Sequence, residues 1–283
     1  MMPVLEIDDL HVEFPTARGP LKAVDGVSLS LQPGERLGLI GESGSGKSTI
    51  ALAVMRLIKP PGQISGGRIV LDGTDLLRLS EEQMRRMRLA EVALITQGAM
   101  NSLNPVIRIR SQVIDSLKAH GRDLSKSGYE DLLAELLRSV GLEPGVADLY
   151  PHQLSGGMKQ RVCIATAISL RPKVIIADEP TSALDVVVQR RVMETLRNVQ
   201  DEIGCAVILI GHDMGLMAQF AQRVAVMRYG HVLEENDVYS IFANPQHPYT
   251  RLLMESLPSL DRRESLQDLE KLKTVAARAE AGV

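Results

Sequence analysis

Cysteine is nearly absent from this chain of 283 residues, which contains two cysteines and no tryptophan. Cys163 lies in a predicted helix, and Cys205 opens an apolar run. Their spacing is typical of neither a zinc site, which needs clustered ligands, nor a disulfide framework. We therefore expect both cysteines to be small residues of the core.

The chain also lacks a large net charge. It contains 32 Lys and Arg and 35 Asp and Glu, which gives a net charge of −3. This balance argues against a nucleic-acid binder, whose affinity comes from neutralising phosphates with basic side chains. No apolar run approaches the roughly 18 residues that predict a membrane span. The N-terminal MMPVLEIDDL lacks the pattern of a signal peptide. We expect a cytoplasmic protein of one large domain or two modest ones, placed where it can contact a membrane protein.

What the sequence does contain is the patterning of an α/β protein. Polar and apolar residues alternate over 4–14 and 23–41, and 65–76 resembles another short strand with turns, which predicts antiparallel strands. Helical patterns separate several short apolar runs, as a largely parallel sheet requires. These runs, each predicted to be a buried strand, are residues 37–41, 91–97, 174–178 and 205–212.

A change of pattern divides the chain into parts. Residues 98–170 show helical spacing and no predicted strand, so we expect a helical subdomain inserted into an α/β core made of 1–97 and 171–242. Residues 243–283 form a C-terminal extension. The last part of this extension is charged, which predicts a short exposed helix with a frayed end.

A glycine-rich loop, GESGSGKST, lies between the first buried run and a predicted helix. It fits the pattern G-x-x-x-x-G-K-[ST], and the strand–loop–helix order is the context that confirms this pattern. The glycines let the backbone curl so that its N–H groups face phosphate oxygens. Lys47 is predicted to reach the β- and γ-phosphates and Ser48 to ligate Mg²⁺; the alternative is a glycine turn beside a solvated lysine. The predicted nucleotide-binding residues here are Gly41, Glu42, Ser43, Gly44, Ser45, Gly46, Lys47, Ser48 and Thr49.

Two carboxylates follow the buried run VIIAD. Asp178 ends the run at the carboxyl end of a strand, where this fold class places a metal-binding aspartate. Glu179 comes next and is predicted to face the γ-phosphate, as the general base that polarises the attacking water. An isolated pair of this kind more often caps a helix or is solvated, so the phosphate loop is what makes the functional interpretation strong.

The segment LSGGMKQR (154–161) is unusual because two glycines stand directly before a predicted helix. Glycine in a helix costs about 1 kcal/mol relative to alanine. Together with GESGSGKST, Gln97, VIIADEPTSALD and His212, LSGG makes the chain resemble the nucleotide-binding subunit of an ABC transporter over about residues 1–240. The resemblance implies a P-loop NTPase fold, with a RecA-like core, an antiparallel β subdomain and an inserted α-helical subdomain.

In the family that the chain resembles, two subunits pack head to tail. Each ATP lies between the phosphate loop of one subunit and the LSGG of the other. Ser155, Gly156 and Gly157 would then leave the N–H groups of a helix open to the γ-phosphate of ATP held by a partner. The alternative is an ordinary serine N-cap or a Schellman-like break.

Four more residues take roles from the resemblance alone. Gln97 matches the Q-loop, which touches Mg²⁺ and the attacking water, and His212 matches the switch histidine at the γ-phosphate. Asp185 ends the motif SALD (182–185), which communicates across the dimer. Phe14 lies where the family places an aromatic residue that stacks on adenine. The alternatives are a strand-end histidine bonded to backbone for His212 and a core residue of the β subdomain for Phe14.

The stretch ANPQHPYTRLLMESLPSL (243–260) is similar to the C-terminal motif of the oligopeptide/dipeptide/nickel importer ATPases. This resemblance implies an ATPase on the cytoplasmic side of the cell membrane that uses Mg-ATP to energise import of peptides or a related small solute. The implied partners are a second ATPase subunit, two transmembrane permeases and an extracytoplasmic solute-binding protein. The alternative is a plain turn ahead of an amphipathic helix. Many relatives continue into a cysteine-rich segment that holds an iron–sulfur cluster, and we expect none here because those cysteines are missing.

Two other functions compete with transport. The accessory ATPase of a phosphonate C–P lyase complex shares the HPYT-like ending and binds a soluble enzyme core. Soluble ABC proteins of translation or DNA repair usually carry two cassettes, long coiled coils or zinc-binding cysteines, and the sequence shows none of these. The transported solute and the identity of the second ATPase subunit stay open.

Overall fold

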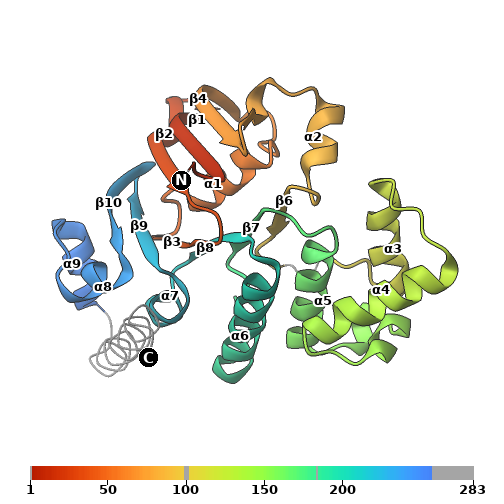
Figure 1. The fold of residues 1–283 in the computed structure, drawn as a ribbon. Coiled ribbons are helices and arrows are strands. Elements are labelled where there is room, and N and C mark those ends of the chain that lie inside the picture. Colours follow the sequence, from red (N-terminus) through yellow and green to blue (C-terminus); the bar gives the residue numbers. More distant parts are fainter. Residues whose placement is uncertain (1, 99–101, 183, 257–283) are drawn as a thin grey trace.

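The computed structural model describes residues 2–98, 102–182 and 184–256, which build two β-sheets and their flanking helices (Figure 1). The helix predicted for the charged C-terminal end lies outside the described residues, and so does Ala183 of the SALD motif.

The first sheet is antiparallel, with strand order β2-β1-β4-β5. On β1, Leu5 and Ile7 are buried, and so are Leu10 and Val12, although the two pairs differ in parity along the chain. A shift of register between Ile7 and Leu10 makes this possible, because one extra residue returns the apolar side chains to the same face. The strands are β1 (Leu5–Thr16), β2 (Gly19–Leu31), β4 (Gln63–Leu71) and β5 (Thr74–Asp75).

The second sheet has the order β10-β9-β3-β8-β7-β6. Neighbouring strands are parallel from β9 to β6, and β10 joins antiparallel at the edge. The central strands β7 and β8 are apolar up to their last residue because helices or the first sheet cover both faces. The strands are β3 (Arg36–Gly41), β6 (Val92–Ile95), β7 (Val174–Asp178), β8 (Ala206–Gly211), β9 (Arg223–Arg228) and β10 (His231–Asp237).

Parallel strands place the predicted motifs along one edge of this sheet. Asp178 at the end of β7 is in register with Ile210, and Ile40 with Gly211. The phosphate loop, the two carboxylates and the segment that begins with His212 therefore all leave the sheet at its carboxyl edge, where ligands bind in such folds.

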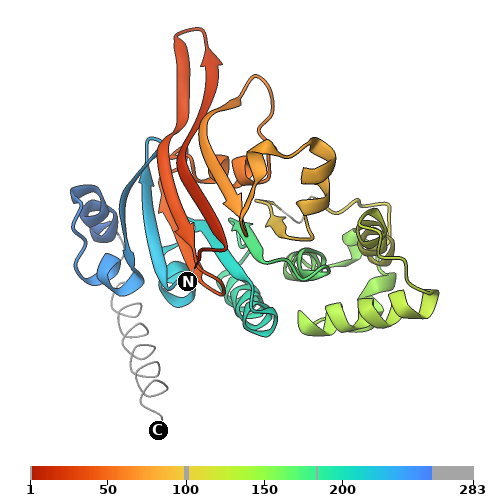
Figure 2. The same cartoon turned by 45° about the horizontal axis from the view of Figure 1, so that its top comes forward.

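Helices surround the second sheet and also form a separate group. Between β6 and β7 the described residues form helices without a strand, and α3, α4 and α5 lie on one side of the molecule, opposite α8 and α9 (Figures 1 and 2). The helices of this group are α3 (Ile109–Ala119), α4 (Lys126–Ser139), η3 (Pro144–Asp148), η4 (Pro151–Gln153) and α5 (Gly156–Ile168). The others are α1 (Lys47–Val54), η1 (Leu76–Arg78), α2 (Glu81–Met87), α6 (Val186–Ile203), α7 (Met214–Phe220), α8 (Val238–Ala243) and α9 (Pro248–Glu255).

The second sheet separates two apolar clusters. On β3, Leu39 belongs to the cluster shared with the first sheet and α1, whereas Ile40 belongs to the cluster shared with the other helices. This alternation follows from the two-residue period of a strand. The phosphate loop thus emerges from a strand that is packed on both faces, which fixes its position.

The predicted α/β class, with an antiparallel sheet and a run of helices between strands, is confirmed. Cys205 is buried and Cys163 half-buried, and burial raises the pKa of each thiol to about 11. Both thiols therefore stay protonated at neutral pH, as the predicted packing role requires. Within the part of the chain that the structure describes, the helices lack the length and apolar character needed to cross a bilayer.

Candidate nucleotide-binding site

The phosphate loop is a tight turn whose shape depends on two glycines. Gly41 has φ +150° and Gly46 has φ +102°. A Cβ atom would lie 2.1 Å from the carbonyl oxygen of Met227 at Gly41, and 2.3 Å from that of Ala23 at Gly46. Backbone on either side therefore holds the loop, and a side chain at these positions would push it out of place.

Lys47 is folded back over this loop. Its Nζ donates hydrogen bonds to the carbonyl oxygens of Gly41 and Glu42, both at 2.8 Å, and to Ser45 Oγ at 3.1 Å. Burial lowers the pKa of Lys47, although Glu179 and Asp178 act in the opposite direction. The ammonium group thus lies within the curl of the loop, where it can contact a bound phosphate.

Helix α1 begins directly behind the loop without a side-chain cap. Its N-cap is Gly46, which has no side chain to occupy the first backbone N–H groups. By contrast, Ser80, Ser125 and Asp237 each accept a backbone hydrogen bond at the start of their helices. The start of α1 therefore keeps N–H groups available to an anion.

Asp178 and Ser48 are in contact where the loop passes into α1. Ser48 Oγ donates a hydrogen bond of 3.0 Å to Asp178 Oδ1, although the two residues are 130 positions apart. Burial raises the pKa of Asp178, and the hydrogen bond from Ser48 only partly opposes this shift. The pair presents two oxygen atoms to one place at the edge of the sheet.

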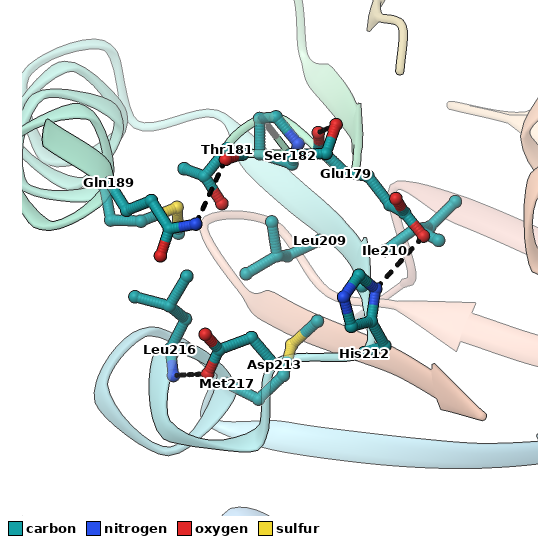
Figure 3. Close-up of a pocket in the computed structure, with 13 residues that line it drawn as sticks. Glu179, Thr181, Ser182, Gln189, Leu209, Ile210, His212, Asp213, Leu216 and Met217 are labelled. Carbon is teal, nitrogen blue, oxygen red and sulfur yellow. Dashed lines mark hydrogen bonds and ion pairs between the residues drawn. The ribbon is translucent and has the colours of Figure 1, made fainter. Parts of the chain in front are cut away.

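Glu179 links the two other predicted catalytic residues. Gln97 Nε2 donates to Glu179 Oε2 at 2.7 Å, and His212 Nδ1 lies 3.3 Å from Glu179 Oε1. The backbone of Glu179 has φ +45°, and its N–H donates to the carbonyl of Ile210 at 2.9 Å. Figure 3 shows the dashed contact between His212 and Glu179 at one end of a cavity of about 70 Å³. The structure therefore brings Gln97, Glu179 and His212 together beside Asp178.

The signature segment lies apart from these residues. Among the described residues, no hydrogen bond or ion pair joins 155–157 to 41–49, and α5 and α1 lie in different parts of the fold (Figures 1 and 2). Ser155 caps α5 by accepting a hydrogen bond of 3.3 Å from the N–H of Met158. Within a single chain, Ser155 is therefore an ordinary N-cap, which is one of the alternatives given for it above.

Gly157 has a packing role that the sequence did not reveal. A Cβ atom there would lie 2.5 Å from Val188 Cγ1 at the start of α6. Asp185 caps α6 and accepts a hydrogen bond of 2.9 Å from the N–H of Val188. The signature helix is therefore packed against the first turn of α6, which the last residue of the SALD motif caps.

Phe14 lies near the end of β1, opposite Leu21 of β2. Its side chain is partly buried against the apolar cluster of the first sheet, and a Cβ atom at Gly62 would lie 2.4 Å from Phe14 Cε1. This environment suits the alternative of a packing residue, and the stacking role stays a prediction.

The groups that shape the loop from outside could not be predicted from the sequence. The carbonyl oxygens of Ala23 and Met227 carry no sequence signal, because every residue has one. Nor could it be predicted that Tyr249 of the HPYT segment (residues 247–250) shares a cavity with Gly41 and Glu42. The HPYT motif is visible in the sequence, but nothing in its spacing predicts a contact with the phosphate loop.

Comparisons with known proteins agree with this geometry. Residues 24–182 match the family model described as ABC transporter, and residues 233–282 match the one described as oligopeptide/dipeptide transporter, C-terminal region. The chain is 44% identical over 276 residues to the dipeptide transport ATP-binding protein DppD of Escherichia coli, covering 97% of this chain and 83% of the relative. It is 44% identical to a putative peptide import ATP-binding protein of Brucella melitensis, covering 96% and 81%.

Solved structures with the same fold include ATP-binding cassettes. The dimeric post-hydrolysis state of the cassette MJ0796 bound to ADP and Pi has a TM-score of 0.73 at 26% identity, covering 83% of this chain and 98% of that one. The protein cbiO1 of Clostridium perfringens, part of the transporter complex cbiONQ, has a TM-score of 0.73 at 26% identity, covering 93% and 99%. The alternative of a C–P lyase accessory protein is not favoured by these matches. The chain belongs to the ABC transporter family, among the ATP-binding subunits of the oligopeptide/dipeptide type.

Proposed function

We propose that this chain is the ATP-hydrolysing subunit that energises import of oligopeptides or dipeptides through a membrane transporter. The observation that carries the proposal is the arrangement at the carboxyl edge of the second sheet. There Glu179 contacts both Gln97 and His212. The residue before it in the chain, Asp178, contacts Ser48.

ATP binds with its phosphates in the loop of residues 41–49. The open start of α1 and the curled backbone offer N–H groups to the phosphates. Lys47, whose pKa is lowered by burial, exchanges its backbone carbonyl partners for phosphate oxygens. Burial makes the charged form of Lys47 unfavourable. A bound phosphate places negative charge beside the ammonium group, so nucleotide binding stabilises the charged lysine.

The residues present fit Mg²⁺, which prefers oxygen ligands. Ser48, Asp178 and the side-chain oxygen of Gln97 would hold the ion, and burial around Asp178 favours a cation that compensates its carboxylate. The ion would supply neutralisation of charge on the β- and γ-phosphates.

Hydrolysis uses Glu179 as the general base. Its carboxylate takes a proton from water while the water oxygen bonds to the γ-phosphorus and the bond to the β–γ bridging oxygen breaks, giving ADP and phosphate. Gln97 and His212 hold the two carboxylate oxygens from opposite ends. His212 is 72% exposed at its side chain, so it is free to turn from Glu179 to a γ-phosphate.

A complete site needs a second subunit. The signature segment lies apart from the phosphate loop of its own chain, which suits a head-to-tail dimer in which Ser155, Gly156 and Gly157 reach the partner's ATP. Next to this segment, Val186 and Val187 are 79% and 64% exposed. Two neighbouring valines this exposed favour a surface that a partner covers. We place the dimer against two permeases on the cytoplasmic side of the membrane, with an extracytoplasmic solute-binding protein supplying the peptide.

Two variants test the proposal. Glu179→Gln keeps the shape of the side chain but removes the base, so hydrolysis should fall by at least about 100-fold and ATP should hold the chain as a dimer. Lys47→Ala should abolish measurable ATP binding. Size-exclusion chromatography with light scattering, with and without Mg-ATP, measures the dimer. Unimpaired turnover in Glu179→Gln would remove this residue from the role of base.

A further inference from the structure

The HPYT segment has no role in the site described above, yet it forms a helix beside the phosphate loop. A cavity of about 340 Å³ lies between α9 and the loop. Gly41 and Glu42 line it from the loop, and Tyr249 lines it from α9. His212 also lines this cavity, which therefore touches the hydrolytic residues as well.

Hydrogen bonds fix α9 in this position. The carboxylate of Glu234 on β10 accepts hydrogen bonds from the backbone N–H groups of Gln246, at 2.8 Å, and His247, at 2.9 Å. His247 Nδ1 in turn accepts the N–H of Tyr249 at 3.1 Å, and Pro248 starts the helix. The segment is thus attached to the edge strand of the second sheet before it reaches the loop.

The ring of Tyr249 is held by an arginine that follows the wall of the loop. The Arg228 guanidinium carbon lies 4.4 Å from the ring centroid, which is the geometry of a cation–π contact. Arg228 comes directly after Met227, whose carbonyl oxygen leaves no room for a side chain at Gly41. Arg228 also contacts the ring of Tyr229, at 4.7 Å.

The hydroxyl group of Tyr249 is in an unusual position. The residue is 4% exposed, and its oxygen is buried with no hydrogen-bond partner among the described residues. Burial raises the pKa of this hydroxyl; the backbone of Glu42 opposes the shift and the Glu42 carboxylate adds to it. Glu42, which acts on this pKa through both its backbone and its carboxylate, belongs to the phosphate loop and lines the same cavity as Tyr249. A buried hydroxyl without a hydrogen bond destabilises the protein. A small movement of Glu42 that completes the hydrogen bond would remove this cost.

We propose that Tyr249 is a positioning residue for the phosphate loop, and that its hydroxyl completes a hydrogen bond to Glu42 when the loop binds phosphates. The inference rests on the nucleotide-binding role proposed above. Because the bond forms with the ligand-bound loop, it contributes to nucleotide affinity rather than to the stability of the ligand-free chain. Reciprocity then requires that nucleotide binding stabilise α9.

The test compares Tyr249→Phe with Tyr229→Phe. The first variant removes only the hydroxyl and keeps a ring on Arg228, and the second removes a hydroxyl from the exposed ring on the same arginine. Calorimetry should show dissociation constants for ATP and ADP that rise about three- to tenfold in Tyr249→Phe, as loss of one hydrogen bond predicts. The turnover number at saturating ATP should stay unchanged, whereas KM should rise. Tyr229→Phe should match the wild type.

Thermal unfolding separates positioning from a merely structural role. In Tyr249→Phe, the melting temperature without nucleotide should be unchanged or higher, while the increase caused by ATP should be smaller than in the wild type. Unchanged affinity, or a lower melting temperature with an unchanged increase, would overturn the inference alone. Failure of the wild type to bind ATP would overturn it together with the proposed function.

Hydrogen exchange gives a second measurement on the unaltered protein. ATP should slow amide exchange in α9 and leave α3, at the far side of the molecule, unchanged (Figure 1). Equal exchange in α9 with and without ATP would contradict the coupling.

Discussion

At the scale of single residues, the site places two charged groups where their charge is disfavoured. Burial lowers the pKa of Lys47 and raises the pKa of Asp178. Both effects make the ligand-free protein less stable than it could be, and both are relieved by phosphate and a cation. Sites that bind charged ligands commonly carry this cost in stability.

Asp178→Asn should therefore raise the melting temperature of the ligand-free protein at pH 7 while abolishing hydrolysis. An asparagine still accepts the hydrogen bond from Ser48 but brings no charge into the buried site. We expect an increase of about 2–4 °C, equivalent to about 1 kcal/mol for a chain of this size. Circular dichroism without nucleotide or Mg²⁺ measures it, and Asp185→Asn, which exchanges one good N-cap for another, is the control.

The same difference should depend on pH. The pKa of Asp178 is higher in the folded than in the unfolded state, so the charge penalty is absent while the carboxyl is protonated in both states. That condition holds below about pH 4. The penalty grows as the pH rises from the unfolded pKa to the folded pKa of Asp178, and it is constant above the folded pKa. The gap between variant and wild type should close at acid pH, and a gap that is constant with pH would show that burial of charge is not its cause.

At the scale of elements, the start of the signature helix is shaped by its contact with α6. Gly157→Ala should destabilise the fold by about 1–3 kcal/mol, because the added methyl group overlaps Val188 and forces the helices apart. Gly145→Ala is the matched control, since a Cβ atom at Gly145 meets nothing within 4 Å. Urea unfolding measures both.

The double variant Gly157→Ala with Val188→Ala then separates two reasons for the glycine. We expect it to regain most of the lost stability but little ATPase activity, because a side chain at position 157 would still crowd the close approach of a partner's ATP to the signature segment. Full recovery of activity would mean that packing against Val188 is the whole reason for the glycine.

The elements that the sequence predicted best are those with one uninterrupted signal. β3 was predicted at 37–41 and β7 at 174–178, and the structure gives Arg36–Gly41 and Val174–Asp178, because buried strands are apolar along their length. The hairpin of β9 and β10 was missed. Its turn consists of Tyr229, at φ +49°, and Gly230, and a tyrosine stands where asparagine, aspartate or glycine is usual.

The residues of the candidate site likewise differ in how well the sequence predicted them. The phosphate loop is contiguous, so its residues could be predicted from one motif. The contact of Gln97 with Glu179 joins residues 82 positions apart, and only the resemblance to a family paired them in advance. The approach of Tyr249 to Glu42 depends on how α9 packs, for which the local sequence gives no signal.

At the scale of the whole molecule, the residues predicted for the ATPase site do not all lie in one place in a single chain. The phosphate loop, Glu179 and His212 share the edge of the second sheet, whereas Ser155 stands at the start of α5 beside α6. The proposed head-to-tail dimer would bring the signature of each chain to the phosphate loop of the other. The central claim is that each ATP is bound by two chains.

Disulfide cross-linking tests this claim most directly. Two differently tagged chains, both Glu179→Gln, carry Ser43→Cys in one and Ser155→Cys in the other; Ser43 is an exposed residue of the loop. Mg-ATP should produce a disulfide between the two tags, and ADP should not. A cross-link that ignores ATP, or one that forms within a single chain carrying both substitutions, would contradict the account.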